Sequence, residues 1–287
     1  MVSFLVHLRL HFQLILSGIF LWAFLLAGGV PDGRAVFAFL VLHVLLYGGT
    51  TTFNAYYDQD QGPVTGLRSP PRASRVCLWG GLGFNLLGAA LALLVSGTFA
   101  AIYVAIMLLG LGYSHPRTRF KSNPAASLLV VAFGQGALGF AAGAAVAVRS
   151  GLPAPTLQLV LGGAAATLLT TGLYPLTQVF QIDEDLARGD RTFAARFGPR
   201  VVFATTVVCF ALALACALPV AWRVFVPVET VAVAVGLGLA ILVLVRWARA
   251  YDPAAQLANH DRVFTIGFLT SMGFVAFIVR HLLERMS

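Results

Sequence analysis

Carboxylates and carboxamides are concentrated in two short segments of this sequence. Six of its eleven acidic residues lie between positions 58 and 60 or between positions 183 and 190. Carboxylates held close together repel one another unless a cation joins them. Mg²⁺ is the natural partner, because it prefers carboxylate oxygens and is usually shared with substrate phosphates. The two acidic segments therefore predict a magnesium site.

The spacing of these side chains predicts that each segment continues the polar face of a helix. Asn54 and Asp58 are four residues apart, so they share a face if the preceding run is helical. The second set is spaced by four, three and four residues: Tyr174, Gln178, Gln181 and Asp185. Both faces begin inside apolar runs, where polar groups are costly and usually functional. A binding or catalytic role is therefore favoured over an ordinary acidic surface loop.

Basic residues follow both acidic segments and also occupy one loop between them. Arginine forks and the lysine ammonium suit phosphate oxygens. The candidates for diphosphate binding are Arg68, Arg72, Arg119, Lys121 and Arg191. Acids that hold Mg²⁺, nearby bases and apolar surroundings together predict a diphosphate headgroup on an apolar tail. Spacing alone leaves open whether Arg68, Lys121 and Arg191 bind phosphate or only set the membrane topology.

The elements that must position these side chains are membrane-spanning helices. Of the 287 residues, 59% are hydrophobic and only 10% are charged, whereas a soluble domain usually has about 25% charged residues. A span needs roughly 20 predominantly apolar residues. Nine such runs occur, at about 10–30, 35–57, 76–97, 99–114, 124–147, 155–180, 201–221, 227–247 and 262–282. The sequence therefore predicts one domain, residues 1–287, that is an all-α, polytopic membrane helix bundle of nine transmembrane helices.

The distribution of positive charge predicts the side of the membrane that the site faces. Nine spans with the N-terminus inside place 14 of the 19 Lys and Arg residues on the cytoplasmic side, where such residues are enriched. Both acidic segments then face the cytoplasm, as expected of a protein of the bacterial inner (plasma) membrane. Topology accounts for the net charge of +8, so no nucleic-acid partner is implied. The three cysteines show no spacing typical of a zinc site or disulfide framework.

Several motifs together resemble those of the UbiA superfamily of intramembrane prenyltransferases. Asn54 and Asp58 resemble the family's N-D-x-x-D-x-x-x-D motif after helix 2, and Asp185 resembles the end of its D-x-x-x-D motif after helix 6. Residues 113–121 resemble the family's Y-S-x-P-P-x-R-x-K loop, and residues 189–198 its G-x-R-T continuation. The combination of motifs is more specific than any one of them, and the likeness in topology covers essentially the whole chain.

The resemblance implies a fold of nine transmembrane helices and a reaction within the membrane lipids. It implies two Mg²⁺ ions as cofactors, with ligands among Asn54, Asp58, Asp60, Gln181, Asp183 and Asp185. It also implies an isoprenyl diphosphate as the donor and an aromatic or other lipophilic acceptor. The catalytic residues that it implies are Asp58, Lys121, Tyr174 and Asp185. The sequence departs from the family's acidic motifs at three positions, Ala55, Gly62 and Gln181. These departures indicate an atypical branch with an altered set of metal ligands.

Two other functions compete with prenyl transfer. A UbiA-type terpene cyclase would ionise the same diphosphate, but the substrate's own double bond would capture the cation. A transporter would place charged groups at broken helices near the membrane midplane. The acids of this chain cluster instead at one side of the membrane, which disfavours transport.

Overall fold

A computed structural model describes residues 1–149 and 151–287, and within these ranges the chain is helical and forms no β-strand. Nine segments in the described ranges are long and apolar enough to cross a membrane, which confirms the predicted fold class and number of spans. The helices of the nine spans are α1 (Val2–His7) with α2 (Leu10–Leu26), α3 (Gly33–Leu40) with η1 (Val41–Tyr47) and α4 (Gly48–Asp58), α5 (Arg75–Val95), α6 (Gly97–Ser114), α7 (Pro124–Val130) with η3 (Val131–Leu138) and α8 (Gly139–Val148), α9 (Leu157–Leu176), α11 (Phe193–Val224), α12 (Pro227–Arg249) and α13 (Gln256–Glu284). Two short helices, η2 (Phe120–Ser122) and α10 (Ile182–Ala187), lie in connecting loops.

Some helix ends differ from the predicted runs because local backbone chemistry, rather than hydropathy, ends a helix. The sixth span is predicted to reach residue 180, but α9 ends at Leu176. Pro175 has no N–H group, and the N–H of Gln178 bonds to the carbonyl only three residues back, at 3.1 Å. The seventh span starts before residue 201, because α11 includes a first turn that precedes a kink at Gly198 (φ 76°).

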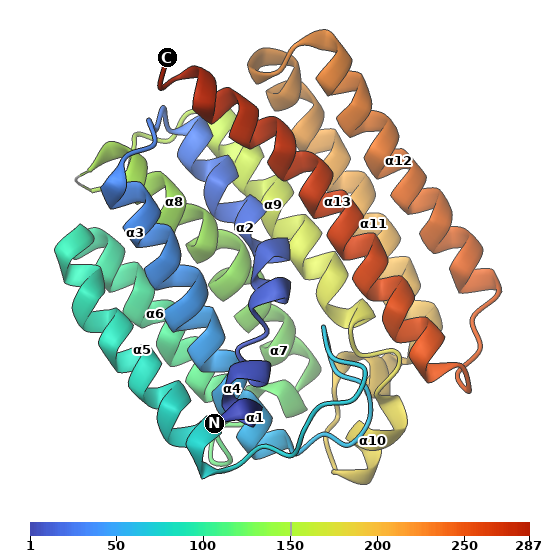
Figure 1. The fold of residues 1–287 in the computed structure, drawn as a ribbon. Helices are drawn as coiled ribbons and strands as arrows, with labels where there is room; N and C mark the ends of the chain where they lie inside the picture. Colours follow the sequence, from blue (N-terminus) through green and yellow to red (C-terminus); the bar gives the residue numbers. More distant parts are fainter. Residues whose placement is uncertain (150) are drawn as a thin grey trace.

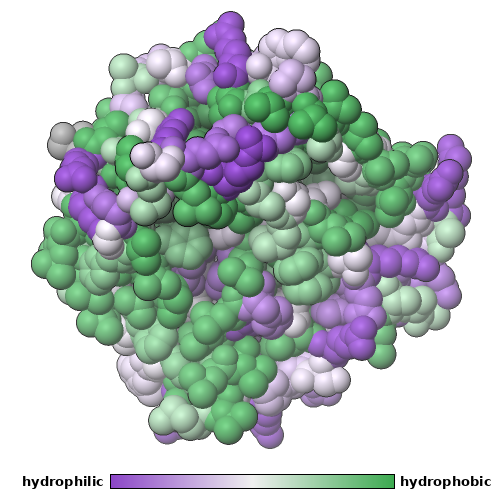
Figure 2. Space-filling model, turned by 45° about the horizontal axis from the view of Figure 1, so that its top comes forward, coloured by the Kyte–Doolittle hydropathy of each residue, from purple (hydrophilic) through white to green (hydrophobic). Residues whose placement is uncertain are grey.

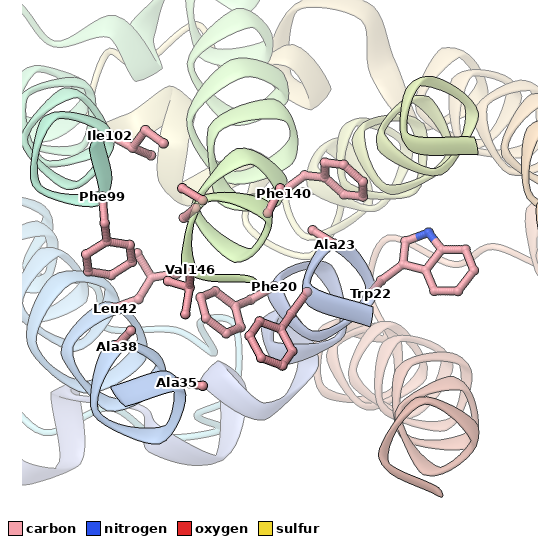
Figure 3. Packing of buried hydrophobic residues seen from close by; sticks show 14 of the residues in the cluster. Phe20, Trp22, Ala23, Ala35, Ala38, Leu42, Phe99, Ile102, Phe140 and Val146 are labelled. Atoms are coloured by element: carbon pink, nitrogen blue, oxygen red, sulfur yellow. The ribbon is translucent and has the colours of Figure 1, made fainter. Parts of the chain in front are cut away.

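The core consists of aromatic rings packed beside small residues, which allow helix backbones to approach closely. The ring of Phe20 lies 5.7 Å from that of Phe39 and 6.4 Å from that of Phe24, measured between centroids. Ala23 and Ala38 are fully buried beside them. Figure 3 shows this cluster, in which side chains from α2, α3, α6 and α8 converge. This packing holds the N-terminal half of the bundle together.

The outer surface of the bundle is largely apolar, as a lipid-facing surface must be. Leu94, Trp222 and Val228 expose 72%, 68% and 72% of their area. In Figure 2, hydrophobic side chains cover large areas of the visible face, and hydrophilic residues form separate clusters. A soluble monomer rarely exposes contiguous apolar patches of this kind, so the surface agrees with an integral membrane protein.

One end of the bundle carries both acidic segments. The loop after α4, the short helix α10 and the N-terminus lie together at the bottom of Figure 1, and the C-terminus lies at the opposite end. An odd number of spans places the two termini on opposite sides. The assignment of the bottom end to the cytoplasm stays a prediction from the distribution of positive charge.

Candidate active site

The first acidic segment begins at the last turn of α4. Asp58 is the final residue of that helix and is buried. One turn earlier, the Asn54 side-chain amide donates a hydrogen bond to Asp58 Oδ2 at 2.7 Å, as the four-residue spacing predicts. The buried ammonium of Lys121, from η2, forms an ion pair with Asp58 Oδ1. The predicted bases of this loop thus meet the predicted acids across 63 residues of sequence.

The second acidic segment follows the end of α9. Asp185 lies on α10 and is buried, and its Oδ2 accepts a hydrogen bond from Thr192 Oγ1 at 2.9 Å. Burial raises the pKa of Asp185 to about 6, although the hydrogen bond from Thr192 and the charge of Arg188 act in the opposite direction. The helix between Tyr174 and Asp185 is interrupted at Leu176, yet both residues face the same cavity.

Arg188 joins the two segments. Its Nη1 donates to Asp60 Oδ1 at 2.6 Å and to the main-chain oxygen of Asp58 at 3.0 Å. Its Nη2 donates to Asp185 Oδ1 at 2.6 Å, and its Nε donates to Asp190 Oδ2 at 3.0 Å. Burial alone would lower the pKa of Arg188, but the hydrogen bond to Asp60 and the surrounding carboxylates raise it. Arg188 is not among the predicted site residues.

Asp190, one of the six clustered acids, is a second residue that is not among the predicted site residues. It is almost fully buried, and its carboxylate accepts two hydrogen bonds from Arg119, at 2.7 and 2.8 Å. Ser122 Oγ donates at 2.5 Å, and Lys121 Nζ lies 3.5 Å away. Burial works against ionisation, but these partners lower the pKa of Asp190 below its usual range. Arg119 therefore acts on the site through Asp190 and does not line the cavity.

A cavity of about 880 Å³ connects this charged cluster with the apolar interior. The polar side chains that line its charged end include Asn54, Asp58, Asp60, Lys121, Gln181, Asp185, Arg188 and Thr192. The hydroxyl groups of Tyr113 and Tyr174, also in the lining, are hydrogen-bonded to each other at 2.9 Å. Farther along the lining lie aromatic side chains, among them Trp22, Phe274 and Phe277. The volume is within the range of about 300–1,000 Å³ that is usual for small-molecule sites.

Three buried polar atoms of the cavity wall have no hydrogen-bond partner among the described residues. They are Arg9 Nε, Gln13 Oε1 and Ser114 Oγ. Arg9 sits at the break between α1 and α2, where its φ of 48° turns the chain. Buried polar atoms are normally hydrogen-bonded, so these three atoms are available to a bound molecule.

The remaining predicted residues lie outside the cavity. Arg68 is 70% exposed and forms a bidentate pair with Asp261, at 2.8 and 2.9 Å. Arg72 and Arg191 are exposed, and so is Asp183 on α10. Helical spacing does not carry across the turn between α9 and α10, so it does not determine which acid of α10 faces inward. These four side chains are therefore not included in the site proposed below.

The residues fit a magnesium ion that takes only part of its coordination from the protein. Among the described residues, no three His, Cys, Asp or Glu side chains converge on one point, so a cage made entirely of protein ligands is not present there. Mg²⁺ usually binds through one or two carboxylates and completes its shell with water and phosphate. Asp58 and Asp185 both line the cavity, and a carboxylate has more acceptor positions than the bonds that each accepts here.

Comparisons with known proteins agree with the fold. The sequence model of the UbiA prenyltransferase family matches residues 16–272. No curated protein matches the chain in sequence. Among solved structures, the chain is similar to a UbiA homolog from Aeropyrum pernix K1, with 19% identity and a TM-score of 0.65 over 93% of this chain and 96% of that one. It is similar to a digeranylgeranylglyceryl phosphate synthase, with 14% identity and a TM-score of 0.65 over 97% and 98% of the two chains.

A third structure is a UbiA homolog from Archaeoglobus fulgidus bound to GPP and Mg²⁺. It is 19% identical, with a TM-score of 0.62, and the likeness covers 95% of this chain and 99% of that one. Identities this low show a shared fold. The family match spans most of the chain.

Proposed function

Because the chain belongs to the UbiA prenyltransferase family, we propose that it transfers an isoprenyl group from a prenyl diphosphate to a lipophilic acceptor in the presence of Mg²⁺. The observation that carries the proposal is a single cavity with an ionic cluster at one end and aromatic walls beyond it. This arrangement matches a diphosphate headgroup on an apolar tail. UbiA homologs from Archaeoglobus fulgidus bound to DMAPP or GPP with Mg²⁺ add support from the same fold.

The diphosphate is placed by this proposal at the charged end of the cavity. Asn54 and Asp58 would hold Mg²⁺ through side-chain oxygens that face the cavity, and Asp185 would hold Arg188 beside the diphosphate. When bound, Mg²⁺ neutralises negative charge on the diphosphate. Lys121, paired with Asp58 and lining the same cavity, donates N–H groups to phosphate oxygens. Charges fixed where the leaving group becomes more negative lower the barrier to breaking the allylic C–O bond.

The allylic carbocation left behind is placed near Tyr113 and Tyr174. Each ring faces a cavity with few polar atoms, and an aromatic face attracts a cation. One of the two hydroxyl groups donates a hydrogen bond to the other, which holds the two rings in place. Keeping water out protects the cation from hydrolysis until the acceptor reaches it. Tyr174 thus acts through its ring and through its bond with Tyr113.

The acceptor is placed by this proposal near the start of α2. Arg9 Nε and Gln13 Oε1 are buried there with no partner among the described residues. A donor and an acceptor atom one helical turn apart suit a molecule with a polar group on an apolar body. The identity of the acceptor is left to experiment.

The same cavity would also serve a UbiA-type cyclase, and product analysis separates the two reactions. Purified protein is incubated with Mg²⁺ and prenyl diphosphates of several lengths, with and without candidate acceptors. We expect release of inorganic diphosphate and formation of a prenylated acceptor, both dependent on Mg²⁺. A cyclic hydrocarbon or alcohol formed without an acceptor would replace transfer by cyclisation. Absence of diphosphate release under all these conditions would contradict both.

Matched variants test the residues assigned to the site. Asp58→Asn and Asp185→Asn each remove a charge with almost no change of size, and each should lower kcat/KM at least about 100-fold, because charge stabilisation is lost in the transition state. Asp252→Asn is the control, since Asp252 is an exposed acid in the loop between α12 and α13 and does not line the cavity. Full activity of both site variants would refute the assignment of Asp58 and Asp185.

A further inference from the structure

The position of Arg188 resembles that of a bridging metal ion. It contacts Asp60 and the main chain of Asp58 on one side, and Asp185 and Asp190 on the other. Four of the five N–H donors of a guanidinium are used in these contacts. The two acidic segments, 128 residues apart at Asp60, are therefore already joined by a cation that belongs to the chain.

Arg188 places a positive charge at the oxygens that a second metal ion would need. A divalent ion between the segments would bind Asp60 Oδ1 and Asp185 Oδ1, and each of these atoms lies 2.6 Å from an Arg188 nitrogen. An added cation there would lie within a few ångströms of a fixed positive charge and would be repelled by it. The space between the segments thus suits one cation, and Arg188 fills it.

Few other acids are placed to bind a second ion. Gln181 lines the cavity but is uncharged, and Asp183 is exposed. Glu184 accepts hydrogen bonds from the main-chain N–H groups of Gln61 and Gly62, at 2.7 and 3.2 Å. Glu184 therefore ties α10 to the loop after α4 and does not line the cavity. Asp58, whose Oδ1 pairs with Lys121 and whose Oδ2 accepts a bond from Asn54, is the cavity-lining acid whose side chain Arg188 does not bind.

We propose that Arg188 takes the place of one metal ion, so that the site binds a prenyl diphosphate with a single divalent cation. The inference rests on the proposed function, because it concerns the same diphosphate site. Arg188 keeps its charge at any accessible pH and presents its donors in a rigid plane that suits phosphate as well as carboxylate. Its fifth N–H group is available to a phosphate oxygen. The two segments are joined before substrate arrives, and Mg²⁺ is required only on the Asp58 side.

Counting bound ions tests this inference without relying on turnover. Protein in lipid nanodiscs is titrated with Mn²⁺ in the presence of geranyl S-thiolodiphosphate, whose C–S bond resists ionisation, and free Mn²⁺ is measured by electron paramagnetic resonance. We expect about one Mn²⁺ per wild-type chain that depends on the analogue. Arg188→Ala frees Asp60 and Asp185, and it should bind about two. Two ions in the wild type, or one in Arg188→Ala, would overturn the inference.

Two further variants separate charge from geometry and folding. Arg188→Lys keeps the positive charge but loses the planar fork, so we expect it to bind one Mn²⁺ and the analogue about tenfold more weakly. Arg200→Ala is the matched control, because Arg200 is exposed and outside the cavity, and it should equal the wild type. If Arg188→Ala does not fold, the counts for the wild type and Arg188→Lys still decide, and two ions in either would contradict the inference. Absence of analogue-dependent Mn²⁺ binding in every protein would instead overturn the proposed function, and the inference with it.

Discussion

At the scale of the residue, the buried acids of the site are each paired with a base. Lys121 pairs with Asp58, Arg188 with Asp60 and Asp185, and Arg119 with Asp190. A buried charge without a partner is strongly destabilising, so these pairs hold the carboxylates in place. The cluster therefore has its charges oriented before any ligand binds, which is what electrostatic stabilisation of a leaving group requires.

Arg188 lines the cavity, whereas Arg191 is exposed, and the sequence alone does not distinguish these two arginines. Both arginines follow the second acidic segment, and the sequence analysis selected Arg191. Gly189 lies between them with φ 83°, a conformation that reverses the chain direction. Because the helical period does not continue through this turn, spacing gives no information on which arginine points inward. Arg188 caps the C-terminus of α10 and lies three residues after Asp185, so the two side chains are on the same helix face.

Asp190→Asn tests the charge cluster through the pH dependence of stability. Since the folded pKa of Asp190 is lowered, its contribution to stability is present above the unfolded pKa and is lost as the pH falls through the folded pKa. We expect the wild type to melt several degrees above Asp190→Asn near pH 7, measured by intrinsic fluorescence in detergent. The difference should shrink below about pH 4, where the acid of the unfolded chain is protonated. A difference of the same size at pH 3 and pH 7 would argue against this account.

At the scale of the element, close helix contacts set the position of the first acidic segment. A Cβ atom placed on Gly81 of α5 would lie 2.6 Å from the carbonyl oxygen of Gly49 and 3.0 Å from the amide nitrogen of Phe53, both on α4. The backbones of α4 and α5 therefore touch at this point. Asn54 and Asp58 follow this contact on α4. The contact therefore sets the position of both side chains along the axis of α4 and the direction in which they point.

Gly81→Ala and Gly83→Ala form a matched pair on one helix. The methyl group added at Gly81 would clash with the α4 backbone, which can shift only if the two helices move apart. Gly81→Ala should therefore lower the melting temperature by several degrees and reduce activity. A Cβ atom at Gly83 meets nothing within 4 Å, and alanine is favoured over glycine in a helix by about 1 kcal/mol. Gly83→Ala should therefore be neutral or slightly stabilising. Equal melting temperatures for the two variants would show that the α4–α5 contact is not tight.

At the scale of the whole molecule, the cavity is a product of helices that are distant in sequence. Its lining includes residues of α2, α4, α6, α9, α11, α12 and α13. The charged end lies at the loops, and the aromatic side chains lie among the spans, so a substrate is oriented with its tail along the membrane depth. The prediction of a two-part substrate from composition and motifs thus corresponds to one continuous space.

Gly236→Phe and Gly238→Phe test this division between headgroup and tail. Gly236 of α12 lines the cavity, whereas Gly238 on the same helix does not, and a Cβ atom at either position meets nothing within 4 Å. A phenyl ring at position 236 should lower kcat/KM about tenfold or more for long prenyl diphosphates and much less for short ones, since lost tail binding is lost transition-state binding. Gly238→Phe should leave the chain-length profile unchanged. A uniform loss across all lengths in Gly236→Phe would contradict a tail site at this wall.

The sequence by itself determined the architecture of this protein and the chemical type of its site. Apolar runs of sufficient length must become helices in lipid, because every backbone N–H and C=O group then has a partner within its own segment. Local spacing also placed Asn54 beside Asp58, since residues four apart share a helix face. Both inferences depend only on neighbours in the chain.

Only the tertiary structure decided which charges meet. Arg68, predicted to bind diphosphate, pairs with Asp261 193 residues away, whereas Arg188 reaches Asp60 across 128 residues. Such partners depend on how whole helices pack and on how the turns at Leu176 and Gly189 redirect the chain. Hydropathy is a sum over one segment, but an ion pair requires two segments to arrive within about 4 Å of each other. The proposed number of bound cations follows from the contacts of Arg188 with both acidic segments, and neither segment's motif predicts these contacts.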